Sequence, residues 1–122
     1  MKRVLIIDDE ESLRLLVGRM LESIPGLEAT LADGGAGTLE LLKRPYDLIL
    51  LDLLMPGLGG LELLKRIRDP GPNQATPVIV VSVVADPSTK TVCRSLGVAD
   101  YVVKPIEREA LIRSVKAALP PA

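Results

Sequence analysis

Short, wholly apolar segments alternate along this chain with longer segments in which apolar residues recur every three or four positions. Residues 4–7, 48–51 and 78–81 are uninterrupted apolar runs. Such runs are typical of parallel strands that helices cover on both faces of a sheet. Residues 28–32 alternate and residues 101–103 form only a short run, so both segments predict strands at the edges of the sheet.

The remaining segments predict five helices. Apolar residues with helical spacing fill residues 13–24 and 111–119, and shorter stretches lie at 39–42, 61–67 and 92–96. Asp86 is expected to cap the fourth helix, with Pro87 as its first residue. Residues 69–74 are rich in proline and glycine and predict a loop.

The order of these segments predicts one α/β domain over residues 1–122. Its sheet has five parallel strands in the order 2-1-3-4-5, with helices on both faces, which is the flavodoxin-like arrangement. Pro120 and Pro121 are expected to end the last helix, and residues 119–122 to begin a linker or tail. A stand-alone domain and the N-terminal part of a longer protein both remain open.

The composition narrows the classes of function. A length of 122 residues and a net charge of −1 indicate one ordinary soluble domain without the basic excess of a nucleic-acid surface. The N-terminal apolar run is too short for a signal peptide, and no stretch is long enough to span a bilayer, so a cytoplasmic protein is expected. Cys93, the single cysteine, lies in a helical pattern and is expected to be a packing residue. Because the chain has no histidine, its chemistry must use carboxylates, hydroxyls and lysine.

Three carboxylates follow two of the predicted central strands. Asp8 and Asp9 come after the first strand and Asp52 after the third. The strand order reverses between these two strands, and such sheets bind ligands at that point, beyond the carboxyl ends. A divalent cation with oxygen ligands, typically Mg²⁺, would offset the repulsion between the carboxylates. Taken singly, Asp9 could instead cap the first helix and Asp52 could be a turn residue.

The other two strand ends add complementary groups. Ser82 ends the fourth strand with a small hydroxyl, and Lys104 follows the fifth with an ammonium group. Acids, hydroxyl and cation at neighbouring strand ends are typical of a phosphoryl-transfer site, in which positioning and charge neutralisation do most of the catalysis.

Four stretches resemble the receiver domains of two-component response regulators. They are VLIIDDEES, DLILLDLLMPGLGGLELL, VIVVSVV and GVADYVVKPI, and together they extend over nearly the whole chain. The resemblance implies a signalling phosphoacceptor and not an enzyme, one that catalyses only its own phosphorylation and slow dephosphorylation.

The same resemblance implies a role for each site residue. Asp52 would take the phosphoryl group from phosphohistidine as a nucleophile. Lys104 would pair with that group or with Asp52, Ser82 would move to bond the phosphate, and Tyr101 would be a switch aromatic that turns inward. Asp9, Asp52 and the Leu54 carbonyl would bind Mg²⁺ directly and Asp8 through water, and the Lys104–Pro105 peptide bond would be cis.

The implied partners are a sensor histidine kinase or phosphotransfer protein and a downstream effector or output domain. The surface formed by the fourth helix, fifth strand and fifth helix, about residues 87–119, would carry the signal and provide a homodimer contact. Neither direct nucleic-acid binding nor membrane association is expected.

The sequence departs from the family pattern beside the expected phosphoryl site. Val83 stands where a small residue is usual, and its branched side chain would crowd the phosphoryl group or the movement of Ser82. Gly59 replaces a common polar residue, and Ile106 replaces a frequent phenylalanine. Leu54 and Val84 offer no polar group to orient an attacking water, which predicts slow loss of the phosphoryl group.

Three other functions fit parts of the sequence. A flavin or nucleotide protein would bind phosphate with a Gly- or Ser-rich turn after the first strand, where residues 8–11 are all acidic here. An aspartyl-phosphate phosphohydrolase would carry an acid two residues after its nucleophile, where this chain has Leu54. The third function is that of a receiver-like module that is never phosphorylated. It remains open because the Val83 side chain would crowd the phosphoryl site.

Overall fold

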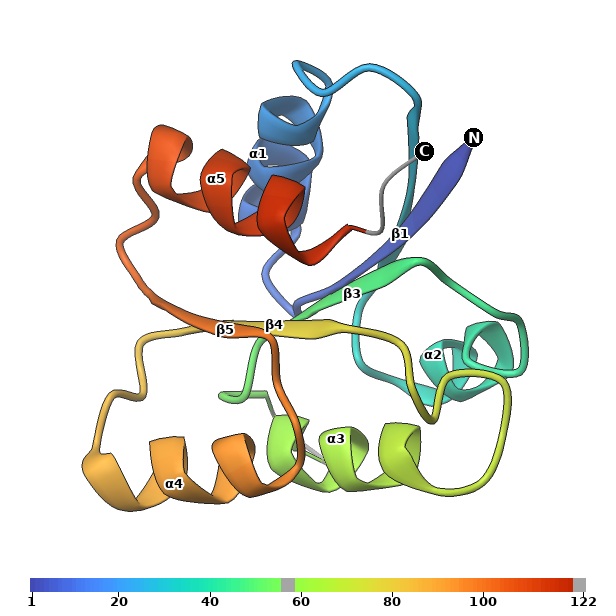
Figure 1. The fold of residues 1–122 in the computed structure, drawn as a ribbon, viewed down its shortest axis with the longest axis vertical. Helices are drawn as coiled ribbons and strands as arrows, with labels where there is room; N and C mark the ends of the chain where they lie inside the picture. The colour runs from blue at the N-terminus through green and yellow to red at the C-terminus, as the bar shows by residue number, and fades with distance from the viewer. Residues whose placement is uncertain (56–58, 120–122) are drawn as a thin grey trace.

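The computed structural model describes residues 1–55 and 59–119, in which strands and helices alternate from end to end (Figure 1). The elements are β1 (Lys2–Ile7), α1 (Glu11–Leu21), β2 (Leu27–Ala32), α2 (Ala36–Leu41), β3 (Leu48–Leu51), α3 (Gly60–Arg68), β4 (Val78–Ser82), α4 (Pro87–Ser95), β5 (Asp100–Val103) and α5 (Arg108–Ala118). The predicted end of the last helix at Pro120 and Pro121 and the tail beyond Leu119 lie outside the described residues, as do residues 56–58.

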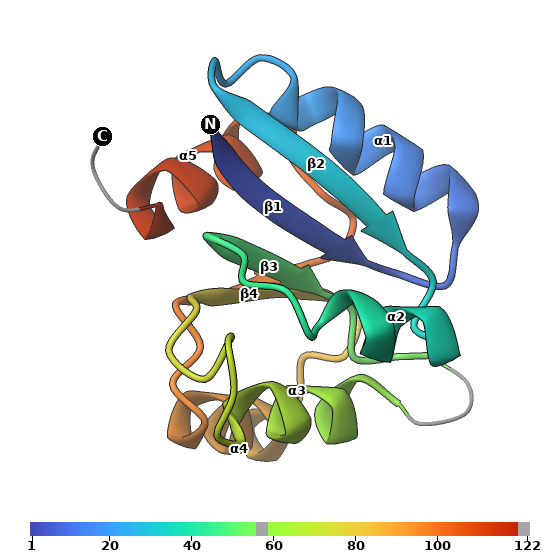
Figure 2. The ribbon, with the colours of Figure 1, turned by 90° about the vertical axis from the view of Figure 1, so that its right-hand side faces the viewer.

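The five strands form one parallel sheet in the order β2-β1-β3-β4-β5, which confirms the predicted topology and the two edge strands. Helices α1 and α5 cover one face, and α2, α3 and α4 cover the other (Figures 1 and 2). The register sets Ile7 opposite Leu51 and Ser82 opposite Val103. As a result, the residues that follow these strands emerge side by side at one edge of the sheet.

Alternate residues of the central strands bury opposite faces of the sheet. Leu5, Ile49 and Val80 pack with Leu63, Leu64 and Cys93 beneath α3 and α4. On the other face, Val4, Leu50 and Ile79 pack with Val17, Leu21, Leu111 and Val115 of α1 and α5. The continuous apolar runs are therefore buried on both faces, as expected, and Cys93 is a fully buried packing residue.

Two predicted helix ends need correction. The first helix starts at Glu11 with Glu10 as its N-cap, so Asp9 is not the capping residue. Its α-helical part ends at Leu21, although Ile24 is still buried. In residues 22–24, each backbone amide donates a hydrogen bond to the carbonyl three residues earlier, because Pro25 disfavours helical geometry in the residue before it.

The predicted cap of α4 is confirmed, since the Asp86 carboxylate accepts from the Thr89 amide at 3.0 Å.

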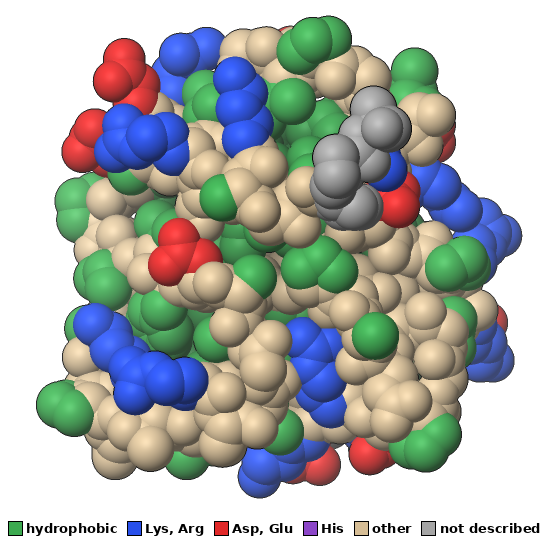
Figure 3. Space-filling view, viewed as in Figure 1, with side chains coloured by type: hydrophobic (Ala, Val, Ile, Leu, Met, Phe, Trp, Pro, Cys, Tyr) green, Lys and Arg blue, Asp and Glu red, His purple; other side chains and the backbone are tan. Residues whose placement is uncertain are grey.

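The predicted loop at residues 69–74 also fastens the start of β3. The buried Asn73 side chain accepts from the Tyr46 amide at 3.0 Å and donates to the carbonyls of Leu42 and Arg44 at 3.0 and 2.8 Å. The loop is therefore anchored to the domain through Asn73, while its other residues are exposed. Positive and negative side chains lie scattered over the face shown in Figure 3, in keeping with the net charge of −1.

The approach of α3 to the end of β3 demands glycine at position 60. A Cβ atom there would lie 2.2 Å from the Asp52 carbonyl oxygen and 2.3 Å from the Leu53 Cα atom, both of them backbone. Gly60→Ala should therefore lower the free energy of unfolding by about 1–3 kcal/mol, as overpacking does, in a urea titration. Gly37→Ala is the control, because a Cβ atom at Gly37 meets nothing within 4 Å. Equal stability of the two variants would contradict this explanation.

Candidate functional site

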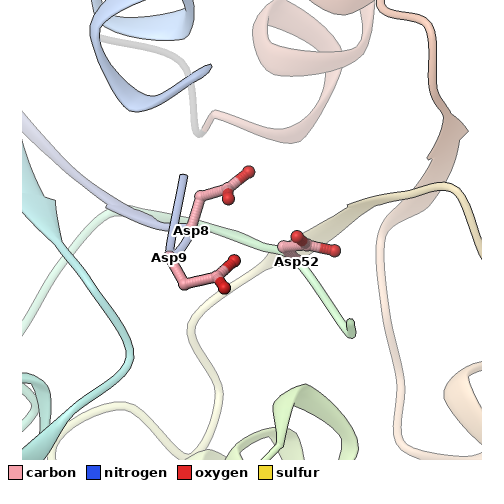
Figure 4. A group of neighbouring side chains, drawn as sticks. All are labelled: Asp8, Asp9 and Asp52. Carbon is pink, nitrogen blue, oxygen red and sulfur yellow. The ribbon is translucent and has the colours of Figure 1, made fainter. Parts of the chain in front are cut away.

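Three carboxylates meet at the edge of the sheet where β1 and β3 end. The Asp52 amide donates to the Ile7 carbonyl at 3.0 Å, which places Asp52 beside Asp8. One carboxylate oxygen from each of Asp8, Asp9 and Asp52 lies within 4.8 Å of the other two (Figure 4). Asp8 and Asp52 are buried and Asp9 is exposed. The predicted convergence of these acids is therefore what the fold produces.

Lys104 links the two buried carboxylates. Its Nζ atom lies 2.9 Å from Asp8 Oδ2 and 3.2 Å from Asp52 Oδ2, and each of the three side chains exposes a tenth of its surface or less. Burial by itself would lower the pKa of Lys104, but the hydrogen bonds and charges of Asp8 and Asp52 outweigh it and raise that pKa above its ordinary value. Lys104 is therefore a permanent cation in the site at neutral pH.

The backbone holds the acids in position. Asp8 Oδ1 accepts from the Glu10 amide at 2.9 Å, and Asp52 Oδ1 accepts from the Leu54 amide at 3.1 Å. Asp52 is thus a turn residue as well as a member of the acidic cluster. In the described part of the chain, no donor is hydrogen bonded to the Asp9 carboxylate, so this group is available to a ligand.

An open cleft of about 580 Å³ gives access to these groups. Its walls are Asp9, Glu10, Leu13, Asp52, Leu54, Met55, Val83 and Lys104. Val83 is 55% exposed and Leu54 is 61% exposed, so two apolar side chains flank the entrance. Val83 is a wall residue, as expected. Val84, which was expected to flank the site beside Leu54, is not among the residues that line the cleft.

Ser82 and Tyr101 are both bonded to Val84 and not to the acids. The buried Ser82 hydroxyl accepts from the Val84 amide at 3.2 Å, and the Tyr101 hydroxyl donates to the Val84 carbonyl. Burial raises the pKa of the Tyr101 hydroxyl, with a further contribution from nearby negative charge, so it remains a donor. The Lys104 amide donates to the Ser82 carbonyl at 2.9 Å. This chain of bonds connects the charged site to β5.

The donor set suits Mg²⁺. Three carboxylates face a single ammonium group, so a divalent cation would balance the remaining charge with the oxygen ligands that it prefers. Both oxygens of Asp8 and both oxygens of Asp52 already accept hydrogen bonds, whereas the Asp9 carboxylate accepts none among the described residues. The three carboxylates, with the Leu54 carbonyl that the family resemblance adds, are the groups that would hold the ion.

Two supporting contacts had no clear signal in the sequence. The Arg14 guanidinium donates to the Asp8 carbonyl at 2.7 Å, and a Cβ atom at Gly34 would come within 2.7 Å of the Met55 sulfur. Backbone acceptors and close approaches of this kind leave no residue pattern. The Lys104–Pro105 peptide bond is cis, as the resemblance implied.

Comparison with known proteins identifies the family. Residues 4–116 match the family model of the response regulator receiver domain, and the chain belongs to this family. The response regulator ArlR of Staphylococcus saprophyticus is 36% identical over 119 residues, which are 98% of this chain and 53% of the relative. ArlR of Staphylococcus haemolyticus is 35% identical with the same coverage. The chain thus spans about half the length of these curated relatives.

Solved structures agree with this assignment. The chemotaxis response regulator CheY4 of Vibrio cholerae matches with a TM-score of 0.84 and 29% identity, over 98% of this chain and 99% of that one. The receiver domain of the sensor histidine kinase PA1611 of Pseudomonas aeruginosa matches with a TM-score of 0.82 and 27% identity, over 95% of each chain. That structure has a magnesium ion coordinated in its active-site cleft. In the described part of this chain, no helix has the length and apolarity to cross a bilayer.

The excess negative charge predicts opposite effects of one substitution with and without metal. Without divalent cations, Asp9→Asn should raise the free energy of unfolding by about 1 kcal/mol, because it removes one of three like charges. With excess Mg²⁺, the wild type should become the more stable protein, because binding to the folded state adds stability. Thermal unfolding in EDTA and in Mg²⁺ measures both effects.

The control for that comparison is Glu28→Gln, which makes the same change of charge on β2, away from the cleft. The difference in stability between Glu28→Gln and the wild type should keep the same sign in EDTA and in Mg²⁺. An Asp9→Asn variant that gains as much stability from Mg²⁺ as the wild type would exclude Asp9 as a ligand.

Proposed function

We propose that this chain accepts a phosphoryl group on Asp52 from a sensor histidine kinase or phosphotransfer protein, with Mg²⁺ bound beside it. The observation that carries the proposal is the pairing of the Asp52 carboxylate with Lys104 at 3.2 Å, within 4.8 Å of two further carboxylates. A nucleophile, a cation and oxygen ligands for a metal thus face one cleft. Phosphoryl transfer needs these three components.

In the proposed reaction, a carboxylate oxygen of Asp52 attacks the phosphorus atom of phosphohistidine. The oxygen–phosphorus bond forms as the nitrogen–phosphorus bond breaks, and the imidazole nitrogen leaves with the electron pair and takes up a proton. Bound at Asp9, Asp52 and the Leu54 carbonyl, Mg²⁺ would supply positive charge to the phosphoryl oxygens. The magnesium in the PA1611 receiver domain supports this assignment.

In the unphosphorylated site, the Lys104 ammonium group donates hydrogen bonds to two carboxylates, those of Asp8 and Asp52. Its bonds to Asp8 and Asp52 hold the ammonium group at the place where phosphoryl oxygens would arrive. When Asp52 carries the phosphoryl group, Lys104 turns to one of its oxygens and Asp8 keeps its bond to the Glu10 amide. The ammonium group therefore needs no new counter-ion at any step.

The alternatives account for less of the site. A phosphate-binding turn after β1 would place flavin or nucleotide phosphates against Asp8 and Asp9. A phosphohydrolase would need an acid at position 54, where the exposed Leu54 stands. A module that is never phosphorylated would need Lys104 only to neutralise the buried acids, and it would give no role to the cleft that opens onto Asp52. We therefore infer a signalling phosphoacceptor and not an enzyme acting on a separate substrate.

The signal would leave through the chain of bonds at Val84. A phosphoryl group adds roughly −1.5 to −2 charge units and three acceptor oxygens. The Ser82 hydroxyl accepts from the Val84 amide and still has its own proton to donate to one of these oxygens, and a movement of Ser82 toward that oxygen would lengthen its bond to the Val84 amide. Tyr101, bonded to the Val84 carbonyl, would then adjust with it. The surface of α4, β5 and α5 would change and dock an effector, an output domain or a second copy of the chain, in the cytoplasm.

Phosphorylation is predicted on Asp52 alone. Incubation with Mg²⁺ and acetyl phosphate should add one phosphoryl group in intact-mass spectra, and peptide mapping should place it on Asp52. Asp52→Asn should abolish labelling, Asp9→Ala should greatly weaken Mg²⁺ binding and thereby labelling, and the exposed control Asp69→Asn should label normally. Undiminished labelling of Asp52→Asn at another residue would refute the assignment.

Slow dephosphorylation is predicted from the apolar entrance of the cleft. Leu54→Asn places an amide where it can orient an attacking water and should speed the loss of the phosphoryl group severalfold. Val84→Glu should have a smaller effect alone, because Val84 does not line the cleft. Decay of the phosphorylated protein, followed by mass spectrometry, measures both. A decay rate unaltered even in the double variant would show that apolar shielding does not control hydrolysis.

A further inference from the structure

Helices α3 and α4 cover the same face of the sheet, and α4 is the more loosely packed of the two. In α4 only Cys93 is buried, whereas α3 buries Gly60, Leu63, Leu64 and Ile67. With one buried side chain, the body of α4 has little apolar packing to fix its position. The position of α4 must therefore be fixed by the hydrogen bonds at its two ends.

The two ends are held in different ways. At the N-terminal end, Asp86 caps the helix, and the preceding loop is tied through Val84 to Ser82 and Tyr101. These bonds lie beside the proposed phosphoryl site and would change with it. The C-terminal end lies at the opposite edge of the sheet, where β4 and β5 begin.

One side chain of α3 occupies that opposite end. The Arg68 guanidinium donates from Nε to the Leu96 carbonyl at 2.7 Å and from Nη2 to the Gly97 carbonyl at 3.2 Å. From Nη1 it reaches the carbonyls of Thr76 at 2.7 Å, Gln74 at 3.1 Å and Asn73 at 3.4 Å. A single side chain thus fastens the end of α4 to the loop that enters β4.

The chemistry of this contact requires arginine. All five acceptors are backbone carbonyls from two separate loops, and a guanidinium is the side chain with donors in a fixed fork. Partial burial lowers the pKa of Arg68, yet no carboxylate pairs with it among the described residues. Arg68 is therefore used as a set of directed donors and not as half of an ion pair.

We propose that Arg68 is a positioning residue that fixes the C-terminal end of α4, so that phosphorylation of Asp52 moves the N-terminal end of the helix about this point. The inference about movement rests on the proposed function. The inference about attachment does not, because it concerns the unphosphorylated chain. Figures 1 and 2 both show α3 and α4 side by side on the same face of the sheet.

Hydrogen exchange of the unphosphorylated protein tests the attachment. Arg68→Met should make the amides of the last two turns of α4 exchange at least roughly tenfold faster, as expected when bonds from a charged donor are lost. Amides of β1 and β3 should be unchanged. Arg68→Lys should show the same change more weakly, because lysine keeps the charge but not the fork. Arg66→Met, an exposed arginine of the same helix, is the matched control.

Three results would overturn the attachment. One is a folded Arg68→Met protein whose α4 amides exchange as in the wild type. Another is faster exchange confined to residues 69–77. The third is equally faster exchange in β1 and β3 in both Arg68 variants, which would make Arg68 a support of the whole fold.

Beryllofluoride, a phosphoryl mimic, tests the movement separately. In the wild type, its effect on α4 exchange should be largest near residues 86–90 and fade toward Leu96, and in Arg68→Met it should extend to residues 94–98. An identical profile in the two proteins would refute the pivot. A wild type that does not bind beryllofluoride would count against the proposed function, while the unliganded comparison would still decide the role of Arg68.

Discussion

The repulsion between carboxylates at the ends of β1 and β3 is the constraint on which the rest of this structure depends. Parallel pairing sets Ile7 opposite Leu51, so Asp8 and Asp52 must emerge together. Two buried carboxylates side by side would be costly unless a cation joined them. Lys104 meets this need because β4 and β5 pair so that it follows Val103, opposite Ser82. The order of the strands thus brings the cation to the acids.

The same arrangement leaves the site incomplete without a ligand. One ammonium group cannot balance three carboxylates, and Asp9 stands exposed. A cluster of this kind is stabilised by whatever brings positive charge, and it changes when negative charge is added. Three bonds lead from that charge toward α4 and β5: the Lys104 amide donates to the Ser82 carbonyl, the Val84 amide donates to the Ser82 hydroxyl, and the Tyr101 hydroxyl donates to the Val84 carbonyl. The acidic site and the surface that we propose to move therefore share one small set of hydrogen bonds.

Much of this was predictable from the chain because apolar runs and strand ends leave strong signals. The runs at 4–7, 48–51 and 78–81 predicted the central strands, and the acids that follow two of them predicted the cluster. The pairing of Lys104 with Asp8 was less accessible, because it depends on how far a flexible side chain reaches in the folded protein. Arg68 and Asn73 could not be predicted, since their partners are backbone carbonyls and amides that every residue carries. Val84 was expected beside the site because of the family resemblance, and it is not among the residues that line the cleft.

The most direct measurement is the amide NMR spectrum of the protein with Mg²⁺, before and after addition of beryllofluoride. If negative charge on Asp52 draws Ser82 away from Val84, the largest shifts outside the cleft should fall on residues 83–106, including Tyr101 and the first turn of α4. Shifts confined to α1 and α2, with residues 83–106 unchanged, would contradict the proposed route from the acidic cluster to the α4–β5–α5 surface.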